Sequence, residues 1–89
     1  MKAVITVTGK DSVGIIASVA ENCSKAGVNI IDISQSVMKE YFAMIMLVDI
    51  DGLNTEFGEF VDRMTRLGRE HGLVISTMHE DIFKSMHHI

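Results

Sequence analysis

Side chains that could form bonds to a substrate or a metal ion are few in this sequence and lie far apart. The single cysteine, Cys23, falls on the apolar stripe of a predicted helix, where a free thiol usually packs as a small hydrophobic group. The four histidines lack the H-x-x-x-H spacing that places two imidazoles on one helix face for a metal ion. We therefore expect no catalytic residue, no metal site, no cofactor and no enzymatic activity.

A glycine-containing loop near the N-terminus offers a different chemistry, the binding of a small charged molecule. It comprises Gly9, Lys10, Asp11, Ser12, Val13, Gly14 and Ile15, and it precedes a predicted helix. The first N–H groups of a helix have no intrahelical partner and carry a partial positive charge, so they suit a carboxylate. Gly14 would let a ligand approach the backbone, and Asp11 could hold an ammonium group. The alternative is that Asp11 or Ser12 only caps the helix, as these residue types commonly do.

The periodicity of apolar residues predicts the elements that position this loop. β-branched residues at 2–8 predict a strand, and apolar residues at spacings of three and four predict a helix over 13–26. Two β-rich runs, 28–38 and 41–50, predict a hairpin, and the alternating run 73–78 predicts a last strand. The stripe of the first helix would comprise Ile16, Val19, Ala20, Cys23 and Ala26.

A second predicted helix follows the hairpin and begins at Asn54 or Thr55. Its apolar face would comprise Phe57, Phe60, Val61, Met64, Leu67 and His71. Its other side offers three pairs at i,i+4 spacing, Glu59–Arg63, Asp62–Arg66 and Arg66–Glu70, which would each add a few tenths of a kcal/mol. Gly72 would end the helix.

The order β-α-β-β-α-β predicts a single α+β domain over 1–89. Right-handed crossovers fold this order most simply into a ferredoxin-like, four-stranded antiparallel sheet with both helices on one face. The first and third strands then lie in the centre of the sheet. The core would span about 1–79, and the amphipathic tail 80–89 would form a short C-terminal helix that places Ile82, Phe83, Met86 and Ile89 on one side.

The third predicted strand is apolar on both faces. One face would carry Phe42, Met44, Met46, Val48 and Ile50, and the other would carry Tyr41, Ala43, Ile45 and Leu47. A strand with one solvated face normally alternates between apolar and polar residues. We therefore expect the helix-free face of the sheet to be covered, either by a second copy of the chain or by the amphipathic tail.

Composition excludes several partners. Eight basic against twelve acidic residues leave a net charge of −4 without any basic run, and the first strand has no aromatic residue on which bases could stack. Both features disfavour nucleic-acid binding. No apolar run approaches the ~20 residues of a membrane helix, and the N-terminus leads directly into a strand rather than a signal peptide. We expect a cytoplasmic protein without a membrane partner.

The segment GKDSVGI, followed by a helix and then GVNI, resembles the ligand loop and second strand of ACT domains. The resemblance covers the βαββαβ order over about 1–79, and the YF start of the third strand with the IF-containing tail is similar to small stand-alone ACT proteins. ACT domains are regulatory modules that bind amino acids or other small metabolites, usually where the first loop of one subunit meets the second strand of another. The resemblance implies a ligand site at Gly9, Asp11, Gly14, Ile15, Asn29 and Ile30, with Ile31, Asp32 and Gln35 beside it.

The resemblance implies a stand-alone regulatory or sensor protein, assembled as a homodimer or higher homo-oligomer, that binds an amino acid at the subunit boundary. Asp11 would take the ammonium group, amides near Gly14 the carboxylate, and Asn29 would fix the orientation. The regulated partner would be an enzyme or a transcriptional regulator. Ser12 and Val13 depart from the common pattern, in which an Arg-Pro pair is frequent. The alternative function is a non-catalytic interaction module with a vestigial ligand site.

Overall fold

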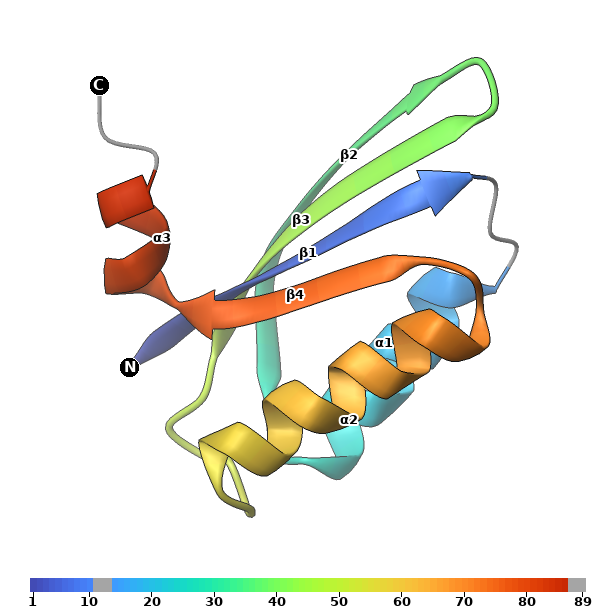
Figure 1. Cartoon of the computed structure of the whole chain (residues 1–89). Helices are drawn as coiled ribbons and strands as arrows, with labels where there is room; N and C mark the ends of the chain where they lie inside the picture. Colours follow the sequence, from blue (N-terminus) through green and yellow to red (C-terminus); the bar gives the residue numbers. More distant parts are fainter. Residues whose placement is uncertain (11–13, 87–89) are drawn as a thin grey trace.

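The computed structural model describes residues 1–10 and 14–86 and shows a β-α-β-β-α-β order followed by a short helix. The elements are β1 (Lys2–Lys10), α1 (Ile15–Lys25), β2 (Asn29–Met38), β3 (Tyr41–Asp49), α2 (Phe57–Glu70), β4 (Val74–His79) and α3 (Glu80–Met86). The helices α1 and α2 lie on one side of the sheet, and α3 stands apart from them beside the end of β4 (Figure 1). The ferredoxin-like fold class and the short C-terminal helix are confirmed, although residues 87–89 of the tail lie outside the described residues.

The sheet has the strand order β2-β3-β1-β4 with antiparallel neighbours, so β1 and β3 are central as expected. β1 and β3 pair along their full length, from Lys2 opposite Asp49 to Lys10 opposite Tyr41. We call the end of the sheet at Lys2 and Asp49 the base, and the end at Lys10 and Tyr41 the tip. The β2–β3 hairpin turns at the tip, where Lys39 has a left-handed φ of 56°.

The core lies between the sheet and the two long helices. Alternate residues of the central strands point into it and are at most 1% exposed: Ala3, Ile5 and Val7 of β1, and Met44, Met46 and Val48 of β3. Phe60 and Met64 of α2 close the core from the helix side and are fully buried. Burying a side chain of this size contributes roughly 1.5–3 kcal/mol, so this face holds the fold together.

Two expectations about the helix faces are wrong. Ile16 is 40% exposed, and Ile15 takes its place at the start of the buried stripe of α1, which keeps the expected Val19 and Cys23. Both isoleucines are apolar, so periodicity alone could not choose between them; the sheet selects the i,i+4 row that begins at Ile15. His71 is exposed rather than buried, because α2 ends at Glu70 and the chain turns away there.

The three expected ion pairs on α2 do not form within the described part of the chain. Glu59 instead accepts a hydrogen bond of 2.6 Å from the hydroxyl of Thr55, one turn earlier. An exposed ion pair between long side chains gains little over solvation, whereas the short Thr55 side chain loses little entropy on bonding. This contact closes the first turn of α2. Among the described residues, neither Arg63 nor Arg66 has a carboxylate within 4 Å.

A close backbone contact at the base fixes α1 against the loop after β3. Gly27 has a left-handed φ of 77°, and a Cβ atom there would overlap the carbonyl oxygen of Gly52. Asn54 donates its backbone N–H to the carbonyl of Ala26 and its side-chain amide to the carbonyl of Lys25, both at 2.9 Å. These bonds satisfy carbonyl groups at the C-terminus of α1 that have no partner in the helix.

Candidate functional site

The glycine loop reaches α1 through Gly14, which is the N-cap residue rather than a first-turn residue as expected. Its φ of 85° is left-handed, and its carbonyl accepts the first helical hydrogen bond from the N–H of Ser18 at 3.0 Å. A Cβ atom at Gly14 would have nothing within 4 Å among the described residues. None of the described residues therefore blocks the approach of a molecule to the backbone of Gly14 on this side.

Three other residues of the expected site fall inside the described part of this loop. Lys10 is exposed, and its ammonium group lies 4.0 Å from the carboxylate of Glu40. Gly9 packs closely against Leu73, whose side chain a Cβ atom would overlap, so the glycine has a structural role there. The side chain of Ile15 is fully buried in the core, which leaves only its backbone N–H for a ligand.

The remaining loop residues, Asp11, Ser12 and Val13, lie outside the described residues. Whether Asp11 binds an ammonium group, or either of the first two caps α1, therefore stays a prediction. No side chain of the described residues caps the helix.

The second half of the expected site lies on β2 at the base. Asn29 and Ile30 border a surface hollow of about 410 Å³ beside the C-terminal end of α1. A register shift between Ile30 and Asp32 makes a bulge at Ile31, which is 46% exposed. The carboxylate of Asp32 accepts a hydrogen bond of 2.9 Å from the N–H of Ile33, which orients it next to the bulge.

A single chain does not bring the two halves of the expected site together. Gly9 pairs with Phe42 at the tip, whereas Asn29 pairs with Asp49 at the base. These two positions on β3 are seven residues apart, which is about 24 Å at roughly 3.4 Å per residue. Among the β2 residues of the expected site, Gln35 lies nearest the tip, because it pairs with Met44.

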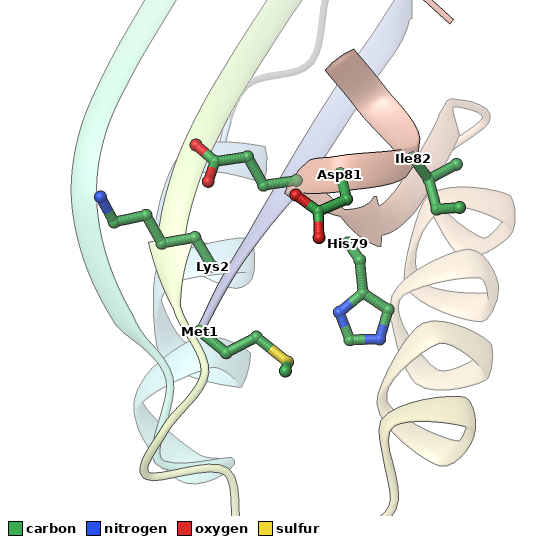
Figure 2. A pocket seen from close by; sticks show the side chains of 6 residues that line it. Met1, Lys2, His79, Asp81 and Ile82 are labelled. Atoms are coloured by element: carbon green, nitrogen blue, oxygen red, sulfur yellow. The ribbon is translucent and has the colours of Figure 1, made fainter. Parts of the chain in front are cut away.

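Another hollow, of about 680 Å³, lies at the base and was missed by sequence reasoning. It is lined by Met1, Lys2, His79, Glu80, Asp81 and Ile82. Figure 2 shows Lys2 and Asp81 entering it from the start of β1 and the start of α3. The two segments that line the hollow, residues 1–2 and 79–82, come together only through the register of β1 with β4, which places Ala3 opposite His79. Neither segment alone therefore carries a sequence pattern from which the hollow could be predicted.

Three polar groups at or beside this hollow contact other groups of the protein. The imidazole ring of His79 stacks on Phe57 with 4.1 Å between ring centroids. The carboxylate of Glu80 lies 3.9 Å from the ammonium group of Lys84. The N-terminal amine pairs with the carboxylate of Asp51, and this hydrogen bond raises the pKa of the amine. We find no nucleophile beside a base in the hollow, so its geometry does not indicate catalysis.

The environment of Cys23 also argues against nucleophilic chemistry. Its side chain is 1% exposed, and burial raises the pKa of the thiol to about 11. The thiol is therefore protonated at neutral pH, whereas a reactive cysteine requires the thiolate. Within residues 1–10 and 14–86, no three histidine, cysteine or carboxylate side chains are grouped to hold a metal ion. None of the helices described is long and apolar enough to cross a membrane.

The sheet order with both long helices on one face makes the chain a ferredoxin-like α+β domain. The family model described as ACT domain matches residues 2–78, and this chain belongs to the ACT domain family.

Similar proteins of the UPF0237 group occur in bacteria and archaea. The chain is 42% identical over 87 residues to one from Listeria innocua, covering 98% of both chains. It is 45% identical to one from Methanococcus maripaludis, covering 97% of this chain and 96% of the relative. It is 46% identical over the full length of both chains to one from Clostridium perfringens. These relatives therefore contain little besides this one domain.

Solved structures show the same fold. An ACT domain protein from Streptococcus pneumoniae superposes with a TM-score of 0.80 at 38% identity and covers 94% of both chains. A putative glycine cleavage system transcriptional repressor is 28% identical with a TM-score of 0.68, matching 85% of this chain and 43% of the repressor. A formyltetrahydrofolate deformylase from Pseudomonas syringae, 20% identical over 27% of its own length with a TM-score of 0.78, shares the fold alone.

Proposed function

We propose that this protein is a stand-alone ACT regulatory protein that binds an amino acid or similar small metabolite between two copies of the chain. Family membership supports a regulatory role, and the match to relatives over nearly their whole length supports a domain that works without an attached enzyme. The regulated partner would be an enzyme or a transcriptional regulator. The likeness to a transcriptional repressor structure at 28% identity is consistent with such a partner.

The observation that carries the proposal is the open backbone at Gly14, where α1 begins. The N–H groups of the first turn have no partner within the helix, and the aligned peptide dipoles add a partial positive charge there. A ligand carboxylate meets both requirements without any basic side chain. Asp11, three residues earlier in the chain, would supply the opposite charge for the ammonium group of the same ligand.

A second copy would supply the other half of the site. β2 is an edge strand with no neighbour on its outer side, and all of its residues except Ile30 are exposed. Two such edges can pair antiparallel about a two-fold axis. Pairing centred on the middle of β2 would place Ile30 of one copy beside Val37 of the other. Within that other copy, Val37 pairs with Phe42, and Phe42 pairs with Gly9. The base segment of the partner would then reach the tip, where the glycine loop lies.

This arrangement would couple ligand binding to assembly. A ligand that touches both copies binds the paired state more tightly than the single chain. By linkage it shifts the population towards the pair, and only such a difference in affinity can transmit a signal to a third protein.

Thermal unfolding in the presence of each of the twenty amino acids tests the proposal. A ligand that binds only the native state at 100 times its Kd adds about 2.7 kcal/mol. For a domain of this size that raises Tm by roughly 10–20 °C. We expect such a rise for at least one amino acid, and we expect Asp11→Ala to reduce it strongly. The matched control is Asp62→Ala on α2, an exposed carboxylate that forms no ion pair with any described residue, which should leave the ligand-induced rise unchanged.

A flat panel would contradict the binding of an amino acid and favour the second candidate, a protein-interaction module. The observation behind that candidate is the set of large apolar side chains on the surface, among them Met38, Tyr41 and Val74, each more than half exposed. Capture of a binding protein by a chain that responds to no amino acid, with Tyr41→Ala abolishing capture, would establish it.

A further inference from the structure

All three arginines of the chain lie on α2, close together in sequence: Arg63, Arg66 and Arg69. Within residues 1–10 and 14–86, none of them has a carboxylate within 4 Å. By contrast, three of the five lysines lie within 4.0 Å of a carboxylate. A guanidinium group offers more N–H donors than an ammonium group, in a fixed planar fork. The cations best suited to bind an oxyanion are therefore among those that no carboxylate of the described residues engages.

Two of these arginines border a hollow of about 280 Å³ between the two long helices, which lie side by side (Figure 1). The described residues that line it are Asn22 of α1 and Arg63, Arg66, Leu67 and Glu70 of α2. The α2 residues stand at positions i, i+3, i+4 and i+7, so they form one row along the flank of the helix next to α1. Arg69 is not part of this row. The hollow therefore brings together two guanidinium groups and one amide.

The amide of Asn22 is held in place at the wall of the hollow. Its Nδ2 group donates a hydrogen bond of 2.8 Å to the carbonyl of Ser18, one turn earlier, and the side chain is half-buried. An amide nitrogen carries two N–H groups, so this bond orients the amide and leaves the second N–H for another acceptor. A donor that is already oriented loses little side-chain entropy when it binds a ligand.

The arginines are not needed to complete the C-terminal end of α1. Basic side chains near such an end can donate to the last carbonyls of a helix, which have no intrahelical partner. Here the carbonyls of residues 22–26 all accept hydrogen bonds of 2.8–3.1 Å. The donors are the backbone N–H groups of residues 26–28 and both nitrogens of Asn54. These carbonyls therefore require no donor from Arg63 or Arg66.

The charge of the hollow is positive, whereas the helices around it are neutral as a whole. Among the described lining residues, two arginines contribute +2 and Glu70 contributes −1, for a net charge of +1. Glu70 lies seven residues after Arg63, which is about 10 Å along the helix at 1.5 Å per residue. The positive end of the hollow is therefore the end next to Arg63.

The two helices together contain four cations and four carboxylates, and the four carboxylates are Glu21, Glu59, Asp62 and Glu70. Glu21 pairs with Lys25 at 2.9 Å, and neither Glu59 nor Asp62 lines the hollow. A neutral surface exerts little long-range attraction on anions. An anion bound there must therefore be held by direct contacts within the hollow.

We propose that the hollow between α1 and α2 binds the phosphoryl group of a small phosphorylated molecule. The fork of a guanidinium group matches two phosphate oxygens, so Arg63 and Arg66 can each make a bidentate contact, and Asn22 can donate to a further oxygen. The three oxygens of a phosphoryl group accommodate these donors better than the two of a carboxylate. Small-molecule sites range upwards from about 300 Å³, so a hollow of about 280 Å³ suits a phosphoryl group on a short carbon chain, which Leu67 would contact.

This site is separate from the amino acid site of the proposed function. Asn22 lies eight residues after Gly14, which is about 12 Å along α1. The hollow is formed within one chain and needs no second copy. Either proposal can therefore fail without the other, because an amino acid panel and a phosphate titration report on different residues.

An NMR titration of the full chain with inorganic phosphate, at constant ionic strength, tests the site. We expect saturable shifts of the Asn22 side-chain amide and of the α2 amides beside it. Arg63→Gln and Arg66→Gln should each weaken binding about tenfold, because each removes a charge-assisted contact. The matched control is Arg69→Gln, on the same helix but outside the hollow, which should leave the affinity unchanged. Shifts that do not saturate, or an equal loss in Arg69→Gln, would overturn the proposal.

Two further titrations test the chemistry of the ligand. Arg63→Lys keeps the charge and removes the fork, so it should weaken phosphate binding several-fold. Unchanged affinity in Arg63→Lys would show attraction by charge alone and would contradict the proposed contacts. On the parent chain, acetate should bind more weakly than phosphate, and glycerol 3-phosphate should bind at least as tightly as phosphate. Acetate binding as tight as that of phosphate, or weaker binding of the phosphate ester, would contradict a site for a phosphorylated molecule.

Discussion

The two faces of β3 carry similar apolar side chains and meet opposite environments. Met46 is 1% exposed under the helices, whereas its neighbour Ile45 is 47% exposed on the opposite, helix-free side of the sheet, which we call the open face. Local sequence does not separate the two, since both residues are large and apolar. The difference comes from the topology, which places both long helices on one side of the sheet. A strand that is apolar on both faces therefore indicates a second layer that the chain alone does not provide.

The comparison is tested most directly by truncating these two adjacent residues. Met46→Ala should lower the free energy of unfolding by about 2–5 kcal/mol at any protein concentration, because it leaves a cavity in the core. Ile45→Ala should cost less than about 1 kcal/mol at submicromolar concentration, where open faces separate. Its cost should grow as the concentration rises, because association stabilises only the parent chain by mass action. Urea unfolding at two concentrations measures both effects.

Equal costs for the two variants at low concentration would show that the open face is already packed within one chain. The outcome would contradict the contrast between the faces. If the cost of Ile45→Ala did not change with protein concentration, the two faces would still differ, but the exposed face would have no role in assembly.

A smaller effect is expected at Thr77, a polar residue on the buried side of β4. The residue is 8% exposed, and its hydroxyl oxygen has no hydrogen-bond partner among the described residues. A buried hydroxyl without a partner costs about 1–3 kcal/mol, so Thr77→Val should raise the stability by about 1 kcal/mol. Thermal unfolding of the variant measures this gain. The matched control is Thr8→Val on the exposed tip, which should change the stability little. A loss of stability in Thr77→Val would reveal a partner for the hydroxyl.

The last prediction concerns the pH dependence conferred by Cys23. Burial raises the pKa of its thiol to about 11, while the unfolded chain should titrate near the ordinary value of about 8.5. The folded state thus holds the thiol proton more tightly. The resulting contribution to the free energy of unfolding is fully present below pH ~8.5 and is lost as the pH rises towards 11. Between pH 8 and pH 10 the parent chain should lose more stability than Cys23→Ala. Parallel pH profiles would show that the thiol titrates alike in both states.

The order and type of the elements could be predicted from the sequence because periodicity and glycine positions agree for each of them. The open face could also be anticipated, since β3 lacks the alternation of a half-solvated strand. The first residue of the buried stripe of α1 could not be predicted, because Ile15 and Ile16 fit the helical spacing of apolar residues equally. Only the position of the sheet decides between them. The ion pairs of α2 were overestimated for a related reason: spacing permits a contact but does not hold exposed side chains in it.

The candidate site is predictable only in part. Glycine at position 14 was singled out by sequence, and the open left-handed backbone there agrees with a role in ligand approach. The separation of Gly9 from Asn29 by about 24 Å depends on strand register, which no local pattern reports. The hollow at the base also depends on register, since it joins the start of β1 to the end of β4.

The two edges of the sheet are unequal, and this limits how copies can add to one another. β2 has ten residues with a bulge near its start, whereas β4 has six and continues directly into α3. Head-to-tail addition of β2 to β4 would leave a fresh edge after every step and would polymerise into a filament. A short, obstructed β4 is a poor acceptor for a long, bent β2, which disfavours such a filament.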